Sequence, residues 1–271
     1  MRWLMKAMTE ALLTNFLVIV MAMALAWRIA VRIGDVSLID AVWGLGMALL
    51  AAASWWQLTS PGASASLIAM MAMLWGLRLG WHLLTRWRAQ GEDPRYAKIL
   101  GSAKADGRFA EAALKRVFGP QALLLFVTCL PAQLGVLANV AAQQIGGLTA
   151  AGLALWLIGL AFEVIGDVQL KAFRADPANK GRVLETGLWR YTRHPNYFGD
   201  ACVWWGVWLA AAEAGPLVAL ASLPGPLFLT FTLTRWSGKP LLEAGLAKSR
   251  PGYAEYVART SGFIPWWPKR G

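Results

Sequence analysis

Hydrophobic positions gather in seven long stretches of the chain, near residues 12–31, 36–57, 65–84, 119–141, 147–168, 198–213 and 216–234. A helix needs about 20 mainly apolar residues to cross the hydrocarbon core of a bilayer. The pattern therefore predicts an all-α integral membrane protein, built as a bundle of seven transmembrane helices. Gly215-Pro216 follows the short sixth stretch closely, which indicates a tight helical hairpin between the sixth and seventh spans.

Basic residues are concentrated in three of the polar segments that separate or follow these stretches. Segment 85–118 carries eight of them, segment 171–197 carries six, and the tail 235–271 carries seven of the 26 in the chain. Because loops rich in Lys and Arg stay in the cytoplasm, we expect a cytoplasmic C-terminus and an N-terminus outside. The same three segments hold 21 of the 26 basic residues, so any chemistry with an anionic partner is expected on that face of a single domain, residues 1–271.

The composition agrees with this class and narrows the chemistry. The chain is 57% hydrophobic and 15% charged, with 16 Trp and a net charge of +11, whereas a soluble domain is about 25% charged. With this hydropathy, the positive charge indicates membrane rather than nucleic acid as the partner. Cys129 and Cys202 lack metal-ligand spacing, and Gly44-Leu-Gly46 lacks the third glycine of a dinucleotide-binding fold. We therefore expect membrane lipid, no nucleic acid and no metal, and leave open whether the chain is a monomer or a homo-oligomer.

Several ionisable side chains fall within or at the ends of the apolar stretches: Asp40, Arg78, His82, Glu163, Asp167 and Asp200. Such residues are costly in a bilayer and are usually functional. Glu163 and Asp167 are four residues apart and share a helical face, which Arg174 continues. This polar stripe belongs either to a ligand site or to an internal ion-pair ladder that closes the bundle. Gly76 and Gly80 match the small-xxx-small pattern, which predicts close packing of the third span against a neighbour.

The densest polar constellation is the segment Gly187–Asp200, directly before a stretch rich in Trp. It contains Arg190, Tyr191, Arg193, His194, Asn196, Tyr197 and Asp200. Arginine offers a planar donor fork for phosphate or carboxylate, and asparagine offers both a donor and an acceptor. The segment therefore predicts a ligand site, although His194 taken alone is as typical of a structural histidine as of a catalytic one.

Two more segments of the basic regions carry candidate residues. Gly91–Tyr96 holds Arg95, and the tail holds Lys239, Glu243 and Tyr256. Each segment is equally typical of an amphipathic element that lies on anionic lipid.

Together these motifs resemble those of a superfamily of membrane enzymes. Gly187–Asp200 is similar to the signature shared by steroid 5-alpha-reductases, sterol C14 and C7 reductases, and isoprenylcysteine carboxyl methyltransferases. The nearest resemblance is to the bacterial branch of steroid 5-alpha-reductase-like proteins described as DUF1295. The matching pieces are Asp40–Gly44, Trp75–Arg78, Gly91–Tyr96, Arg190–Asp200, and the tail residues Glu243, Tyr253, Tyr256, Ile264 and Pro265.

The resemblance implies a seven-helix bundle that binds NADPH from its cytosolic side. Carried over residue by residue, the implied cofactor-binding residues are Arg95, Glu163, Asp167, Arg174, Arg182, Tyr191, Arg193, His194, Asn196, Tyr197, Asp200, Lys239, Glu243 and Tyr256. Glu163 is a departure, because the steroid enzymes usually have Asn at that position.

On the substrate side, the resemblance gives three candidate catalytic residues: Asp40, Trp75 and His82. Trp75 stands where the steroid enzymes have a Tyr, and an indole cannot donate a proton as a phenol does. Asp40 is the nearest acid and would be a proton donor if burial kept its carboxyl neutral. It is equally typical of a helix N-cap or of an ion pair with Arg78.

The leading hypothesis is a membrane-embedded, NADPH-dependent reductase of a C=C bond in a lipophilic, steroid-like or isoprenoid substrate. In activity it would be similar to a 3-oxo-5-alpha-steroid 4-dehydrogenase. The alternatives are an S-adenosylmethionine-dependent methyltransferase of a lipid-like substrate and a non-enzymatic lipid-binding membrane protein. The surplus of basic residues favours NADPH, because S-adenosylmethionine has no phosphate to neutralise.

Overall fold

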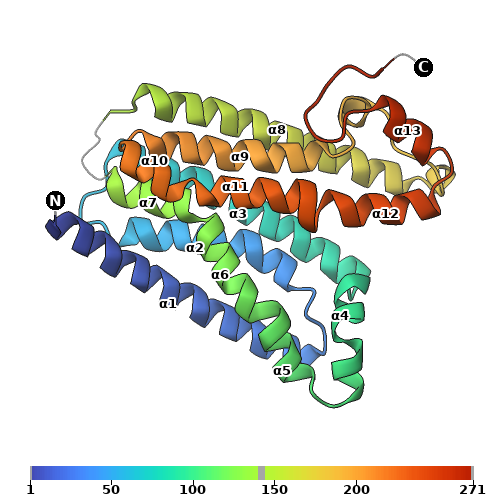
Figure 1. Cartoon of the computed structure of the whole chain (residues 1–271), viewed down its shortest axis with the longest axis horizontal. Coiled ribbons are helices and arrows are strands. Elements are labelled where there is room, and N and C mark those ends of the chain that lie inside the picture. Colours follow the sequence, from blue (N-terminus) through green and yellow to red (C-terminus); the bar gives the residue numbers. More distant parts are fainter. Residues whose placement is uncertain (1, 140–143, 270–271) are drawn as a thin grey trace. The chain divides into compact units, whose positions relative to one another are not determined.

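The computed structural model describes residues 2–139 and 144–269 (Figure 1). About 80% of the described residues are helical, and none of them lies in a β-strand. The prediction of an all-α protein is therefore confirmed.

Contacts divide the chain into two compact units, each made of two chain segments. The N-terminal unit comprises Met1–Ala150 and Val207–Gly225, and the C-terminal unit comprises Ala151–Gly206 and Pro226–Gly271. Because both units are discontinuous in sequence, the expectation of a single domain stays a prediction.

The N-terminal unit is built from eight α-helices among its described residues: α1 (Arg2–Ile33), α2 (Ile39–Trp56), α3 (Ala63–Gln90), α4 (Pro94–Ala105), α5 (Phe109–Ala113), α6 (Gly119–Thr128), α7 (Leu130–Ala138) and α10 (Pro216–Ser222). A π-helical turn, η1 (Leu114–Phe118), joins α5 to α6. The helical segment then bends by 44° between α6 and α7. Pro131 stands just after this bend, and proline lacks the backbone N–H that a continuous helix needs.

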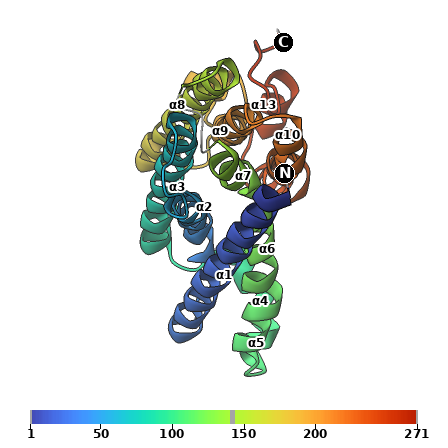
Figure 2. The same cartoon turned by 90° about the vertical axis from the view of Figure 1, so that its left-hand side faces the viewer.

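α2 and α3 lie side by side and approach each other at glycines (Figure 2). A Cβ atom on Gly44 would lie 2.6 Å from the carbonyl oxygen of Gly76 and 2.7 Å from the backbone nitrogen of Gly80. Backbone atoms cannot move aside as the end of a flexible side chain does, so these positions require glycine. The close packing predicted from Gly76 and Gly80 is confirmed.

Buried amide and hydroxyl groups join three helices of the N-terminal unit. Asn15 on α1 donates from Nδ2 to Ser54 Oγ on α2 at 2.7 Å and to Gln133 Oε1 on α7 at 3.0 Å. All three side chains are 0% exposed. Because buried polar groups need hydrogen-bond partners, this network fixes how α1, α2 and α7 pack together.

The C-terminal unit contains most of three helices, α8 (Gly147–Ala175), α9 (Pro195–Ala212) and α11 (Pro224–Phe231), together with α12 (Lys239–Ser249) and α13 (Tyr253–Arg259). Two 3₁₀ turns, η2 (Pro177–Asn179) and η3 (Gly187–Arg190), lie between α8 and α9. A π-helical turn, η4 (Thr232–Trp236), links α11 to α12.

Glycines also set the distance between α8 and α9. Gly152, Gly159 and Gly166 recur every seven residues on α8, and Gly199 and Gly206 do so on α9. A Cβ atom on Gly159 would lie 2.5 Å from the carbonyl oxygen of Gly199, and one on Gly206 would lie 2.6 Å from that of Gly152. A seven-residue repeat keeps one helical face turned toward its partner. The repeat therefore holds the start of α9, where the polar constellation ends, against α8.

Five helical segments are long and apolar enough to cross a membrane: Lys6–Ile33, Ile39–Trp56, Ala63–Gln90, Gly147–Ala175 and Pro216–Ser249. The bent segment of α6 and α7 makes a sixth if it is one span. Each of these six overlaps one predicted stretch, and most extend beyond it. Residues 140 and 141 of the predicted stretch 119–141 lie outside the described residues. The predicted stretch 198–213 falls in α9, which is not among them. A multi-pass membrane protein is thus supported, while seven spans and the orientation of the termini stay predictions.

The predicted helical hairpin is present: α9 ends at Ala212, α10 begins at Pro216, and Trp208 Nε1 donates across the turn to the carbonyl of Ala219 at 2.9 Å. Gly215 between them has φ 117°, a conformation that favours glycine. The basic segments differ from the loops expected from their polarity. Segment 85–118 contains α4 and α5, and the tail contains α12 and α13. The polar composition indicated loops, although the sequence contains signals for the start of a helix. Pro94 begins α4, and the side chain of Asp93 before it accepts from the Arg95 backbone N–H at 2.8 Å.

Gly44→Ala is expected to lower the free energy of unfolding by about 1–3 kcal/mol, because the added methyl group would push α2 away from α3. Gly101→Ala is the matched control. Gly101 lies within α4, and a Cβ there meets nothing within 4 Å, so alanine should leave stability unchanged or raise it by about 0.5–1 kcal/mol. Thermal unfolding of the purified protein in mild detergent measures both. Equal stability of the two variants would contradict the glycine contact.

Candidate functional site

A buried guanidinium organises the polar constellation of the C-terminal unit. Arg193 is 8% exposed, and its Nε donates to Glu243 Oε1 at 2.8 Å. One terminal nitrogen donates to the carbonyl oxygens of Thr260, at 2.5 Å, and Val257, at 3.2 Å. The backbone N–H of Arg193 donates to the carbonyl of Ser261 at 2.9 Å. Because a buried charge needs a counter-charge and hydrogen bonds, the protein itself supplies the partners of Arg193.

His194 shares the carboxylate of Glu243. Its Nε2 lies 2.9 Å from Glu243 Oε1, and its ring, 1% exposed, stacks on Tyr197 with 5.2 Å between ring centres. Burial lowers the pKa of His194 and outweighs the opposing effect of Glu243. A neutral ring that donates from Nε2 to a carboxylate has an acceptor at Nδ1. That atom is buried and has no hydrogen-bond partner among the described residues.

The segment before α9 is held against α13 and the residues that follow it. Tyr256 on α13 is 2% exposed and donates from its hydroxyl to the carbonyl of Trp189 at 2.5 Å. Burial raises the pKa of Tyr256, so the phenol keeps its proton. Thr192 Oγ1 donates to the carbonyl of Phe263 at 2.8 Å. These bonds fix residues 189–192 relative to the C-terminal end of the chain.

Two other predicted residues flank this region. The first is Lys239, which lies beside Gly262. A Cβ atom on Gly262 would be 3.3 Å from Lys239 Cε and 3.1 Å from a terminal nitrogen of Arg193. The Tyr191 ring meets the Trp267 ring edge-on, with 5.3 Å between ring centres. Both residues therefore pack against the segment that follows α13.

A cavity of about 90 Å³ lies among the end of α8, residues 182–193, α12 and α13. Its charged lining consists of four arginines, Arg174, Arg182, Arg193 and Arg250. Its aromatic lining comprises Phe173, Trp189, Tyr253 and Tyr256. Guanidinium groups bind phosphate through a planar donor fork and also stack on rings. The five remaining lining residues are aliphatic: Leu170, Val183, Leu184, Leu242 and Leu246. The lining therefore suits an apolar or ring-bearing group with an anionic part.

Four predicted residues lie along the contact of α8 with α9 instead. Glu163 is 3% exposed and sits beside Gly199, where a Cβ would be 3.1 Å from its own Cβ. Asn196 Nδ2 donates to Asp167 Oδ1 at 3.3 Å, and Asp200 follows Asn196 by one helical turn. None of these four is among the described residues that line the cavity.

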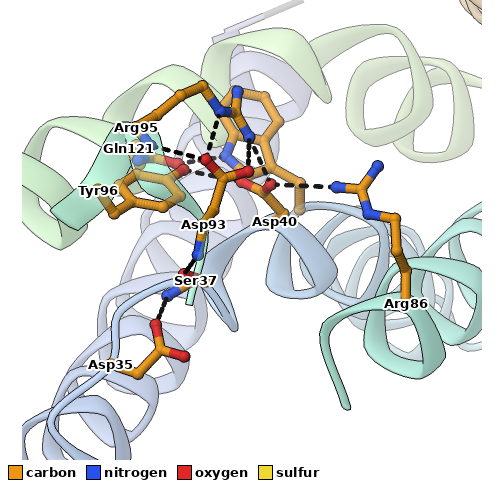
Figure 3. A network of polar contacts seen from close by, with 9 residues as sticks. Asp35, Ser37, Asp40, Arg86, Asp93, Arg95, Tyr96 and Gln121 are labelled. Carbon is orange, nitrogen blue, oxygen red and sulfur yellow. Dashed lines mark hydrogen bonds and ion pairs between the residues drawn. The ribbon is translucent and has the colours of Figure 1, made fainter. Parts of the chain in front are cut away.

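A second polar cluster lies in the N-terminal unit, where α2 and α4 begin and α3 ends (Figure 3). Asp40, in the first turn of α2, accepts from the Tyr96 hydroxyl at 2.7 Å and from an Arg95 terminal nitrogen at 2.9 Å. Arg86 lies 3.5 Å from the same carboxylate. Asp93 holds Arg95 from the other side, accepting from its Nε at 3.0 Å. Asp40 is therefore surrounded by donors.

The cluster continues through Ser37 to Asp35. Ser37 Oγ accepts from the Asp93 backbone N–H at 2.8 Å, and Asp35 accepts from the Ser37 N–H and from Trp87 Nε1, both at 2.7 Å. Burial acts to raise the pKa of both aspartates. Hydrogen bonds from Trp87 and Ser37 to Asp35, and from Arg95 to Asp93, outweigh burial and lower these pKa values. Both carboxylates are thus ionised acceptors that tie the start of α2 to the end of α3.

The predicted catalytic residues all belong to the N-terminal unit. Trp75 is 1% exposed within α3, and His82 is half-buried two turns further along the same helix. The donors around Asp40 make it an acceptor, which favours a positioning part over the proton donation considered from the sequence. Arg95, expected at the cofactor, is hydrogen-bonded to Asp40 and Asp93. The catalytic assignments stay predictions.

Sequence reasoning missed Arg250 in the cavity and Asp93 and Gln121 in the second cluster. Arg250 stands just before Pro251-Gly252 and α13, so a basic residue at a turn next to two tyrosines was the available signal. Asp93 carries the Asp-Pro signal of a helix start. Gln121 accepts from Trp43 Nε1 at 2.5 Å. It is distant in sequence from the other residues of the cluster, so only the tertiary structure brings it there.

Comparison with known proteins gives one extensive match and several partial ones. A family model described as "Protein of unknown function (DUF1295)" matches residues 26–260. The probable O-methyltransferase ustE of Ustilaginoidea virens is 32% identical over 89 residues, which is 31% of each chain. The 3-oxo-5-alpha-steroid 4-dehydrogenase 1 of Mus musculus is 33% identical over 82 residues, 30% of this chain and 29% of that enzyme. Its counterpart in Rattus norvegicus is 32% identical over 83 residues, 31% of this chain and 29% of that enzyme.

The partial matches span less than a third of these curated relatives. No solved structure matches at a significant level. The family match, in contrast, takes in α2 to α13 and both polar clusters. The chain therefore belongs to the DUF1295 family, in agreement with the resemblance of its motifs to the steroid 5-alpha-reductase-like proteins.

Proposed function

We propose that the protein is a membrane-embedded, NADPH-dependent reductase that acts on a C=C bond of a lipophilic, steroid-like or isoprenoid substrate. The partial similarity to two steroid 4-dehydrogenases supports this reaction class. The multi-pass apolar helices support a lipophilic substrate. A bacterial inner membrane is the proposed location.

The observation that carries the proposal is the arginine-lined cavity of the C-terminal unit. The side chains of Arg182 and Arg250 have no hydrogen-bond or ion-pair partner among the described residues. They are therefore available to phosphate oxygens. Trp189, Tyr253 and Tyr256 supply ring surfaces beside them.

The size of the cavity limits how much of a dinucleotide it holds. Small-molecule sites usually measure about 300–1,000 Å³, and this cavity measures about 90 Å³. It fits one phosphate-bearing end of the cofactor, and the rest would lie beyond it. The buried acceptor at His194 Nδ1 suits an N–H donor such as a carboxamide.

Arg193 takes a positioning part in this proposal. Its nitrogens bind Glu243, Thr260 and Val257, so it shapes the cavity wall and keeps His194 in place. Asn196, Asp167, Glu163 and Asp200 would act in the same way along α8 and α9, by orienting the start of α9.

NADPH, when bound, supplies the hydride in reductions of this class. On the substrate side, we propose that Asp40 orients the hydroxyl of Tyr96 and the guanidinium of Arg95, to which it is hydrogen-bonded. His82 is the proposed source of a proton, and Trp75 a wall of the substrate site.

A second candidate is an S-adenosylmethionine-dependent methyltransferase of a lipid-like substrate. The partial similarity to a probable O-methyltransferase favours it. That cofactor carries no phosphate, however, so it would leave Arg182 and Arg250 without a counter-charge. We therefore place it second.

Cofactor titration of the purified protein in mild detergent tests the proposal. We expect NADPH to raise the melting temperature and quench tryptophan fluorescence, and S-adenosylmethionine to have no effect. NADH should bind more weakly, because arginines favour the 2′-phosphate. Binding of S-adenosylmethionine alone would establish the methyltransferase alternative, and binding of neither by folded protein would leave a lipid-binding protein.

Arg182→Gln and Arg250→Gln are each expected to weaken NADPH binding about ten-fold, the effect of losing one charge-assisted hydrogen bond. Arg88→Gln is the matched control, since Arg88 is an exposed arginine at the end of α3. It should bind NADPH as the unmodified protein does. Equal NADPH affinity of all three variants would contradict the proposal that this cavity binds the cofactor.

The free energy of unfolding should decrease as the pH is lowered, because His194 takes up a proton more readily in the unfolded chain. Its pKa in the folded protein is below the ordinary value of 6.5, so the unfolded chain binds the proton first. The contribution of the neutral ring is fully present above about pH 6.5 and is lost progressively below it. In His194→Gln, we expect a smaller drop in melting temperature between pH 8 and pH 5.5. The same scan on His82→Gln distinguishes the two histidines of the chain, and an unchanged drop in His194→Gln would contradict the assignment.

A further inference from the structure

A second and larger cavity of the C-terminal unit is separate from the proposed cofactor cavity. It measures about 420 Å³ and is lined by Glu185, Thr186, Gly187, Arg190, Arg259, Thr260 and Pro268. None of these residues lines the smaller cavity. Its volume lies within the usual range of ligand sites, about 300–1,000 Å³.

The charge of this cleft suits an anion. Arg190 is exposed, and its side chain has no partner among the described residues. Arg259 is ion-paired with Glu185, and both side chains are about half exposed, at 45% and 46%. Exposed ion pairs contribute little stability. An anionic ligand that binds Arg259 more strongly can therefore replace Glu185 as its partner. Two guanidinium groups and the Thr186 hydroxyl would then face it.

The cleft adjoins two tryptophans that the fold holds in an exposed position. Trp266 and Trp267 are 71% and 72% exposed. Their segment, which follows α13 (Figure 1), is fixed by backbone hydrogen bonds. The N–H of Trp266 donates to the carbonyl of Tyr191, and the N–H of Lys269 donates to that of Arg259, both at 2.9 Å. The Tyr191 ring packs against Trp267, so the exposure of the indoles is part of the fold.

Arginine and tryptophan side chains close together suit the surface of an anionic bilayer, where a charged headgroup layer lies next to an interfacial layer. Tryptophan favours the interface between hydrocarbon and water, and arginine near the surface is attracted to anionic lipid headgroups. A soluble phosphate would use only the arginines and would leave both indoles in water. A phospholipid uses both features, since its phosphate lies next to the interfacial layer.

We propose that the cleft binds the phosphate of an anionic phospholipid, such as phosphatidylglycerol, through Arg190 and Arg259, while Trp266 and Trp267 lie in the interfacial layer. Glu185 occupies Arg259 when the lipid is absent. The site would anchor the end of the chain, and with it the segment that binds Tyr191 and Arg193, at the membrane surface. This inference does not depend on the identity of the cofactor.

Lipid titration of the full-length protein in neutral detergent tests the proposal, with bound lipid counted by native mass spectrometry. Phosphatidylglycerol is expected to bind and phosphatidylcholine to bind weakly. Arg190→Gln and Arg259→Gln should each weaken phosphatidylglycerol binding about five-fold, the value expected for one cation near an anionic surface. Glu185→Gln should strengthen it by releasing Arg259. Arg88→Gln should bind as the unmodified protein does.

Three further arms separate the other possible occupants. Inorganic phosphate that displaces phosphatidylglycerol, with Trp266→Ser and Trp267→Ser binding the lipid normally, would mean a site for a free anion. A parallel loss of NADPH affinity in Arg190→Gln would assign the cleft to the cofactor. A change from dimer to monomer in Trp267→Ser would assign the indoles to a contact between two copies. Each of these results, or equal binding of both lipids, would overturn the proposal.

Discussion

The buried guanidinium of Arg193 is the interaction on which the arrangement of the C-terminal unit depends. A charge that is 8% exposed is tolerated only with a full set of partners. The chain supplies them from α12, from the end of α13 and from the residues after it. Satisfying one side chain thus brings His194, Glu243 and the Tyr256 hydroxyl into one region. The same contacts form a wall of the arginine-lined cavity. They also show that some residues of the polar constellation bind other parts of the protein itself.

Glycine provides the second constraint, because it decides how closely the long helices approach. Helices in lipid gain little from hydrophobic burial against each other, so their association depends on close van der Waals packing. Gly152 and Gly159 on α8, seven residues apart, meet Gly206 and Gly199 on α9 at backbone distance, and Gly44 meets Gly76 on α3 in the same way. Polar residues such as Glu163 and Asn196 are carried to defined places by these contacts.

The proposed activity and the proposed lipid site use different properties of one basic surface. Arg182 and Arg250 border a small cavity whose other walls are mostly aliphatic and aromatic, and we propose that they bind the phosphate of a cofactor there. Arg190 and Arg259 border a larger cleft beside two exposed indoles, which fits a lipid headgroup. Both sets come from the segments around 182–190 and 250–259.

The sequence by itself determined the all-helical class, the presence of several apolar helices, their approximate positions and the family, because hydropathy and local motifs depend only on neighbouring residues. It also placed the polar constellation at Gly187–Asp200, since seven polar side chains gather there directly before an apolar stretch rich in Trp. Only the tertiary structure decided that Arg193 pairs with Glu243, 50 residues away, that Asp40 is surrounded by donors, and that Arg250 lines the cavity. The helical spacing of Glu163 and Asp167 left open a ligand site or an internal ion-pair ladder, and only the approach of α9 showed that both residues lie at the contact of α8 with α9. Pairings of this kind depend on which helices meet and in what register, and no local pattern of residues records that.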